Sequence, residues 1–78
     1  MPRFFTHQVE YDLAISDEEG AEFPDFAAAR ADVVAAGREM LFILIKEGRV
    51  VDDRALEIWD EDGNLLETIR LRDLMLLS

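Results

Sequence analysis

The sequence predicts a two-layer α+β domain in which one long helix packs across a small, largely antiparallel sheet. The evidence is a helical period of apolar residues in the middle of the chain and strand-like alternation on both sides of it. The predicted elements are a strand over 3–11, a helix over about 25–47 and a hairpin of strands over about 55–60 and 65–72. Because the 78 residues contain neither repeats nor linkers, we expect a single domain, 1–78.

The first strand is predicted from aromatic and β-branched residues that alternate with polar ones. Period two gives this strand two faces, one with Phe5, His7, Val9 and Tyr11 and the other with Phe4, Thr6, Gln8 and Glu10. A short extended segment is expected at Leu13-Ala14-Ile15. The acidic sequence Asp17-Glu18-Glu19-Gly20 then indicates a turn, with Gly20 free to adopt positive φ.

The helix has recognisable start and stop signals. Pro24 disfavours helical angles in the residue before it, Asp25 can cap the first free amides, and Gly48 suits the end of a helix. At 100° per residue, the stripe expected to face the sheet is Phe26, Ala29, Val33, Gly37, Met40, Leu41 and Leu44. We expect a strand to approach closely at Gly37, and we expect Arg30, near this stripe, to pair with a carboxylate.

The opposite side of the helix is unusually apolar. The six consecutive apolar residues from Met40 to Ile45 must point in all directions around the helix, whereas a helix on the surface of a soluble domain keeps a polar side. Small residues followed by a large aromatic would allow a second helix to approach closely. The candidate interface residues here are Ala31, Ala35, Phe42 and Ile45. The alternative is that Phe42 lies under a loop of its own chain, such as 49–54.

The hairpin is predicted from Asp62-Gly63, a dipeptide that favours tight turns between strands. With this dipeptide as the turn centre, one face carries Leu56, Ile58, Leu65, Ile69 and Leu71, with Glu67 as the exception. Trp59 and Leu66 then lie side by side on the other face, which makes them a second candidate interface, although an ordinary half-exposed tryptophan is the alternative. The apolar tail, 73–77, is expected to dock as a short turn or helix.

Composition excludes several classes of function. Eighteen acidic against eight basic residues give a net charge of −10, which disfavours binding to nucleic acid or to an anionic membrane. No apolar run is long enough for a signal peptide or a membrane span, so a cytoplasmic protein is expected. The absence of cysteine excludes disulfides, which leaves oligomerisation as the usual means of stabilising so small a domain.

No catalytic, cofactor-binding or metal-binding constellation is predicted. His7 is the single histidine, and neither serine lies in a nucleophile motif, so His7 is expected to be a partly buried structural residue. Asp60, Asp62, Asn64 and Glu67 supply oxygens that suit calcium, but their spacing does not match an EF-hand loop. An acidic hairpin turn explains them more simply.

Several short motifs resemble a family of short bacterial proteins known only as a domain of unknown function. They are Met1-Pro2-Arg3-Phe4-Phe5 with His7, Asp17-Glu18-Glu19-Gly20, Pro24-Asp25 with Ala28-Ala29-Arg30, and Asp60-Glu61-Asp62-Gly63 with Arg72-Asp73. The resemblance covers nearly the whole chain. It implies a bacterial cytoplasmic protein without an established activity, cofactor or partner, and it supplies no catalytic residues.

The leading functional hypothesis is a non-enzymatic homodimer that serves as a structural or interaction module. Its predicted interface is the outer side of the helix, with the Trp59 face as the second choice. The alternative is an acidic regulatory partner, antitoxin-like or imitating nucleic acid, that binds a basic target through its negative charge.

Overall fold

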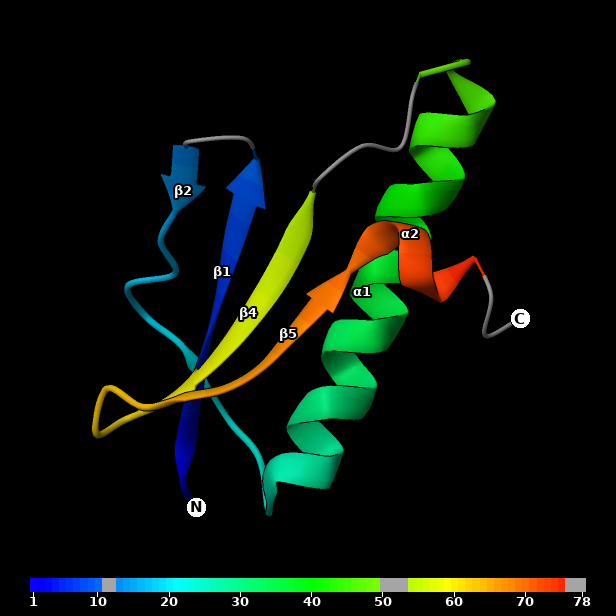
Figure 1. The fold of residues 1–78 in the computed structure, drawn as a ribbon. Helices are drawn as coiled ribbons and strands as arrows, with labels where there is room; N and C mark the ends of the chain where they lie inside the picture. The colour runs from blue at the N-terminus through cyan, green and yellow to red at the C-terminus, as the bar shows by residue number, and fades with distance from the viewer. Residues whose placement is uncertain (11–12, 50–53, 76–78) are drawn as a thin grey trace.

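The computed structural model describes residues 1–10, 13–49 and 54–75. In chain order these residues form β1 (Arg3–Glu10), β2 (Leu13–Ile15), β3 (Ala21–Glu22), α1 (Phe26–Lys46), β4 (Ala55–Asp60), β5 (Leu65–Arg70) and α2 (Leu71–Leu74). Helix α1 lies along one face of the sheet, so the described chain has two layers (Figure 1). The predicted α+β fold is therefore confirmed.

The sheet formed by the described residues is antiparallel, with strand order β2-β1-β4-β5, and β3 also pairs with β1. Gln8 pairs with Leu56 on the face toward α1, called the inner face below. His7 pairs with Glu57 on the opposite, outer face. The predicted alternation of the first strand is confirmed through Glu10, while Tyr11 lies outside the described residues.

Helix α1 begins and ends as its flanking residues predict. The Asp25 carboxylate accepts a hydrogen bond from the Ala28 N–H at 2.8 Å, which satisfies one of the free amides of the first turn. At the other end Gly48 adopts a φ of 70°, and the Arg49 N–H donates to the Leu44 carbonyl at 2.8 Å. The ends of the helix are thus fixed by local hydrogen bonds.

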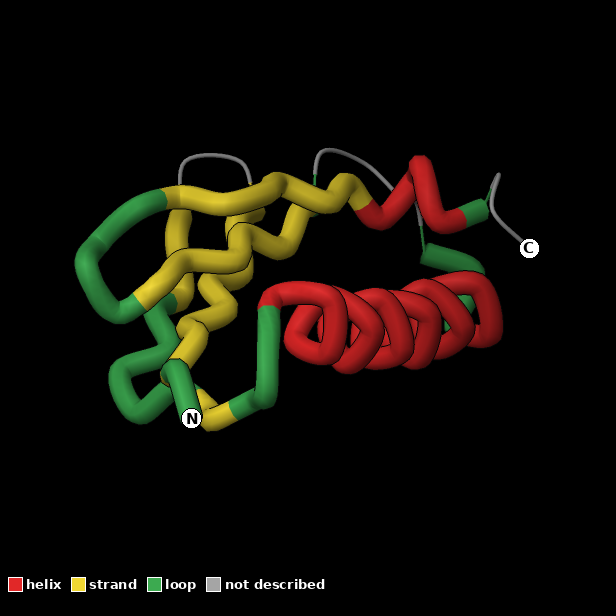
Figure 2. Tube along the Cα trace, turned by 90° about the horizontal axis from the view of Figure 1, so that it is seen from below, coloured by secondary structure: helices red, strands yellow, loops and turns green. Residues whose placement is uncertain are grey.

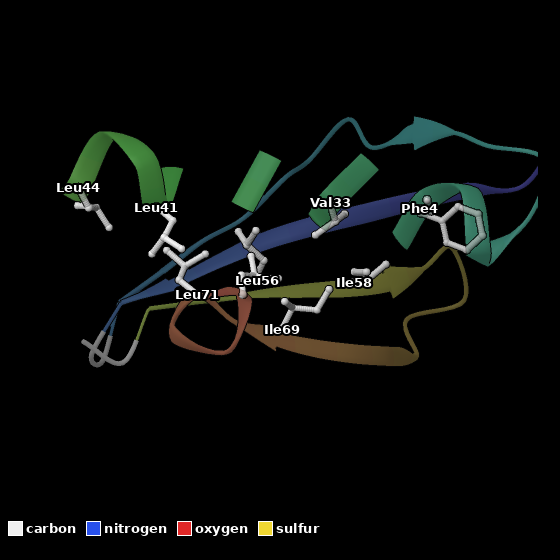
Figure 3. Packing of buried hydrophobic residues seen from close by; sticks show 10 residues of the cluster. Phe4, Val33, Leu41, Leu44, Leu56, Ile58, Ile69 and Leu71 are labelled. Carbon is white, nitrogen blue, oxygen red and sulfur yellow. The ribbon is translucent and has the colours of Figure 1, made fainter. Parts of the chain in front are cut away.

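The core lies between α1, the inner face of the sheet and α2 (Figure 3). Its buried residues are Phe4, Ala29, Val33, Leu41, Leu44, Leu56, Ile58, Ile69, Leu71 and Leu74. The predicted sheet-facing stripe of the helix is confirmed, since Phe26 and Met40 also pack against this core. A Cβ atom on Gly37 would lie 2.6 Å from Leu74 Cδ1 and 3.4 Å from Leu56 Cδ1. The close approach predicted at Gly37 therefore involves α2 as well as a strand.

The tip of the hairpin differs from the prediction. Ile58 pairs with Glu67 as expected, but Trp59 pairs with Leu65 rather than lying opposite Leu66, and Leu65 is exposed instead of buried. The reason is the loop, in which the Asp60 carboxylate accepts the N–H groups of Asp62 and Asn64. These bonds favour a three-residue loop over a two-residue turn, and the extra residue is absorbed as a bulge.

The second strand of the hairpin is also shorter than predicted. It ends at Arg70 instead of 72, and the chain turns directly into α2. Leu71 and Leu74 are both buried, so a helical turn brings two leucines onto the core. The predicted docking of the tail as a short helix is confirmed through Leu74, although the helix starts two residues earlier than the predicted tail. Residues 76–78 lie outside the described part.

Helix α1 runs under the sheet and continues beyond it toward the end where α2 lies (Figure 2). Leu41 and Leu44 in this half of the helix are buried in the same cluster as Leu71 and Leu74 of α2. The apolar run of α1 thus has one side covered by α2.

Candidate interaction surface

The outer surface of α1 carries three large apolar side chains that are open to solvent. Phe42 is 67% exposed, Ile43 53% and Ile45 57%. The predicted interface residues Ala31 and Ala35 lie on the same side of the helix and are also exposed. Among the described residues no loop covers Phe42; of the segment 49–54, which was the alternative cover, residues 50–53 lie outside the described part.

Two shallow grooves flank Phe42. One, of about 400 Å³, is lined by Arg38, Glu39, Phe42 and Ile43. The other, of about 320 Å³, lies toward α2 and is lined by Arg38, Leu41, Phe42, Ile45, Leu74 and Met75. Since Met75 is itself 49% exposed, the apolar surface is continuous from α1 to the end of α2. Large exposed apolar patches of this kind mark sites of interaction with other molecules.

On the second predicted surface, Trp59 already has contacts within its own chain. The Trp59 indole N–H donates to Glu57 Oε1 at 3.2 Å, and its ring lies 5.8 Å from the His7 ring. Trp59 is half-buried, and Leu66 is 41% exposed beside the hairpin bulge. The indole already has its hydrogen bond and a ring contact, so this face presents less unsatisfied surface than Phe42 does.

His7 and Asp17 connect β1 to the acidic turn after β2. The Asp17 N–H donates to His7 Nδ1 at 2.9 Å, so the proton of the neutral ring lies on Nε2. The Asp17 carboxylate in turn accepts the N–H groups of Thr6 at 3.2 Å and Gly20 at 3.1 Å. These contacts give His7 the structural surroundings that were predicted for it.

The same hydrogen bonds set the charge state of Asp17. Burial of this carboxyl acts to raise its pKa, but hydrogen bonds from the backbone of Gly20, Thr6 and Glu19, together with the nearby His7, outweigh it. The pKa of Asp17 therefore lies below its ordinary value, and the carboxylate is held in its charged form.

Arg30 has found the carboxylate partner that the sequence predicted. Its Nε donates to Glu67 Oε1 at 2.9 Å and to Oε2 at 3.1 Å. Glu67 lies on the inner face of β5, opposite Ile58. The hydrogen bonds and charge of Glu67 raise the pKa of Arg30, so the guanidinium stays charged. This ion pair joins α1 to the sheet and explains why a charged residue stands in the middle of β5 on the apolar face of the hairpin.

The sequence profile of a domain of unknown function (DUF6894) matches residues 3–72, from the first strand to the start of α2. The chain belongs to the DUF6894 family. The resemblance noted in the sequence is thereby confirmed, and it brings no activity with it. No curated protein and no solved structure matches the chain. Among the described residues of this DUF6894 domain, neither helix is long and apolar enough to cross a membrane.

The fold separates the acidic residues that could have suggested a calcium site. In the DUF6894 domain the Asp60 carboxylate accepts the Asn64 N–H at 2.8 Å and the Asn64 side-chain amide at 3.1 Å. These hydrogen bonds from Asn64, with further ones from the backbone of Asp62 and Gly63, lower the pKa of Asp60. Glu67 instead faces Arg30. In the part of the chain that the structure describes, no three His, Cys, Asp or Glu residues are grouped to hold a metal ion.

In the DUF6894 domain two apolar residues of β2 are exposed, which the sequence did not predict. Leu13 is 62% and Ile15 49% exposed on β2, where they pair with Glu10 and Gln8 and so belong to the inner face of the sheet. Helix α1 does not bury them. Period two over Leu13-Ala14-Ile15 already placed both side chains on one face, but the sequence does not show which strands the helix covers.

Proposed function

We propose that this DUF6894 domain is a homodimeric interaction module without catalytic activity of its own, and that the outer surface of α1 joins its two copies. The observation that carries the proposal is the exposure of Phe42, Ile43 and Ile45 on one helix. Burying large apolar side chains contributes roughly 1.5–3 kcal/mol each, so a second copy that covers them gains considerable stability. In a symmetric dimer each of these residues is buried once in each copy, so its contribution counts twice.

The surroundings of His7 support a module without catalysis. Its Nδ1 accepts the Asp17 N–H, and the ring lies beside Trp59. A general base needs a free nitrogen within reach of a substrate proton, and the nitrogen that accepts in His7 is already engaged in joining two segments of the chain. We therefore assign His7 a structural role.

Light scattering coupled to size exclusion tests the proposal. The wild-type chain should have the molar mass of a dimer, and Phe42→Asp should give a monomer because two carboxylates would be buried within the contact. Leu13→Asp is the matched control, since Leu13 is similarly exposed but lies on β2. A Phe42→Asp protein that keeps the dimer mass, or a Leu13→Asp protein that loses it, would move the interface away from α1.

A second candidate function is an acidic partner that binds a basic protein. It is favoured by the net charge of −10 and by a groove of about 270 Å³ between α1 and β1, where Asp17 and Asp32 lie beside an apolar floor that includes Phe23 and Met40. An arginine or lysine side chain has the apolar stem and cationic head that such a groove suits.

Salt dependence separates the two candidates. A complex held by charge and captured from a lysate should weaken steeply as ionic strength rises, whereas apolar self-association should change little. Asp32→Asn should weaken the charge-driven complex, and Asp62→Asn in the hairpin loop serves as the charge-matched control. Capture that is insensitive to both salt and Asp32→Asn would remove this candidate.

A further inference from the structure

We infer that the two copies pair antiparallel through α1, with Phe42 of each copy seated between Ala31 and Ala35 of the other; this inference rests on the homodimer proposed above. Side-chain size and charge both vary along the exposed side of the helix. Both differ between the first half of the helix and the second half. A contact between two copies must therefore choose a direction.

Side-chain size gives the first argument. At 100° per residue Ala31 and Ala35 fall within about 20° of the direction of Phe42, so the three share one line along the helix. The alanines occupy the first half of this line, whereas Phe42 occupies the second half, with Ile45 about 60° to one side of it. An antiparallel pair places the large residues of one helix over the small residues of the other. A parallel pair would bring Phe42 against its own counterpart and leave the alanines facing each other across a gap.

Charge gives the second argument, and it is independent of size. Asp32 and Lys46 lie on the same flank of the helix, about 80° and 40° from Phe42, and are separated by about 21 Å along the axis. When Phe42 lies opposite the space between the alanines, Lys46 of one copy lies three residues, about 4.5 Å along the axis, from the level of Asp32 of the other, an offset that the long lysine side chain can span. The dimer then contains two ion pairs across the interface. In a parallel pair the two-fold axis runs along the helices, so Asp32 and Lys46 stay about 21 Å apart along the axis and no such ion pair forms.

The residues at the centre are consistent with this register. The two-fold axis passes near Arg38, so that Arg38 and Glu39 of both copies surround it with two positive and two negative charges. The dipoles of the two helices also oppose each other in an antiparallel pair, which is the favourable arrangement. Arg38 lines both grooves that flank Phe42, so these grooves extend to the axis.

Engineered cysteines test the register, because the natural sequence contains none. Under oxidation, Arg38→Cys should crosslink to its own counterpart beside the axis. Ala31→Cys and Ile45→Cys should each fail to crosslink alone, since each lies about 20 Å from its counterpart in this register. The double variant Ala31→Cys with Ile45→Cys should crosslink almost completely, because each cysteine then faces the other type in the second copy.

The outcomes distinguish the register from the dimer itself. The molar mass of every variant is first measured in reductant, where a dimer supports the proposed function whatever the crosslinks show. A dimer in which Ala31→Cys alone crosslinks to itself is parallel and overturns the inference, while the homodimer stands. A dimer in which neither Arg38→Cys nor the double variant crosslinks also overturns it. A monomer mass for the unsubstituted chain removes both the dimer and its register.

Discussion

Arg30 and Glu67 come from elements far apart in the chain and meet where α1 crosses β5, with Arg30 Nε 2.9 Å from Glu67 Oε1. The carboxylate sits on the inner face of the sheet, opposite Ile58, and its side chain is 31% exposed. A charge in such a position is tolerated because its partner reaches it from the helix. Each residue alone breaks the apolar pattern of its own element, and together they satisfy each other.

The first prediction concerns this pair. Arg30→Ala should lower the melting temperature by several degrees, because it leaves a carboxylate on the inner face without its partner. Adding Glu67→Leu should restore most of the loss, since an apolar side chain suits the position opposite Ile58. Thermal unfolding followed by circular dichroism measures both effects.

Arg3→Ala provides the control for Arg30→Ala. It breaks the Arg3–Glu22 ion pair, whose side chains are 41% and 50% exposed. In the Arg30–Glu67 pair the arginine is exposed to the same degree, at 43%, but the carboxylate is only 31% exposed, so the Arg3–Glu22 pair should contribute less to stability. The account of Arg30 is wrong if the two arginine variants lose the same stability, or if Glu67→Leu lowers the melting temperature further.

The second prediction concerns Gly37 and Leu74. Replacing glycine by alanine inside a helix gains about 1 kcal/mol of intrinsic stability, but here the new Cβ would lie 2.6 Å from Leu74 Cδ1. The gain should therefore be cancelled in the wild-type background, and Gly37→Ala should be close to neutral. In a Leu74→Ala background the obstructing atom is absent, so Gly37→Ala should stabilise the domain by about 1 kcal/mol.

Denaturant unfolding of the four proteins in this cycle gives the coupling between the two positions. Gly37→Val is a further check, because a larger β-branched side chain should cost about 1–3 kcal/mol through overpacking. Equal effects of Gly37→Ala in both backgrounds would mean that α2 does not press on the helix at this point.

The third prediction is a pH dependence of stability from Asp17. The pKa of its carboxyl is lower in the folded chain than the ordinary value of 3.8, so the folded state binds fewer protons than the unfolded state there. The stability that Asp17 contributes is therefore complete above about pH 5 and is lost as the pH falls through its folded pKa. The difference in melting temperature between wild type and Asp17→Asn should be largest near neutral pH and vanish in strong acid.

The matched control is Glu18→Gln, because Glu18 is a neighbouring carboxyl that is exposed. It should show no such trend with pH. A difference between wild type and Asp17→Asn that stays constant down to strong acid would show that Asp17 acts through geometry alone.

The fourth prediction tests the charges across the proposed antiparallel contact. Asp32→Lys and Lys46→Asp should each weaken the dimer, and the double variant should recover the wild-type affinity. Exposed ion pairs contribute about 0.2–1 kcal/mol each, and reversing two per dimer should raise the dissociation constant by roughly tenfold. Sedimentation at low and high salt measures this, and the differences should shrink as salt increases.

Recovery in the double variant is the informative result. In a parallel dimer Asp32 and Lys46 stay about 21 Å apart along the axis, so the double variant should not recover what either single variant loses. Failure of the double variant to recover, with both single variants weakened, would show that Asp32 and Lys46 do not meet.

The sequence was sufficient for the helix and for its inward face because the relevant signals are local. Asp25 and Gly48 act within one turn of the helix ends, and the apolar period of the helix is independent of what covers it. Arg30 was expected to pair with a carboxylate for the same reason. That the carboxylate is Glu67 depends on the angle at which the helix crosses the sheet, which no local pattern contains.

The hairpin tip and the strand ends were predicted less well because side chains compete there with the backbone. The Asp60 carboxylate accepts hydrogen bonds from the N–H groups of Asp62 and Asn64. These bonds favour a three-residue loop over a two-residue turn, and the longer loop shifts the register between Ile58 and Trp59. The chain likewise leaves the sheet at Leu71 because two leucines reach the core from a helical turn. Burial of these leucines in the core thus outweighs the strand propensity of the segment.

The candidate surface could be predicted in part. Phe42 and Ile45 were expected at the outer side of the helix because six apolar residues in succession cannot all be covered by one sheet. Met75 joined this surface only once the fold placed α2 beside the same half of the helix. Leu13 and Ile15 were not expected to be exposed, since the sequence does not show where a helix stops covering its sheet.

The molar mass of the wild-type chain in solution, measured by sedimentation equilibrium over a wide range of concentration, tests the central claim most directly. The exposed Phe42 surface predicts a mass twice that of the 8.9 kDa chain, with dissociation only on dilution. A mass of 8.9 kDa that persists at the highest concentration would contradict the account, because Phe42 and its neighbours would then remain in water without a second copy to cover them.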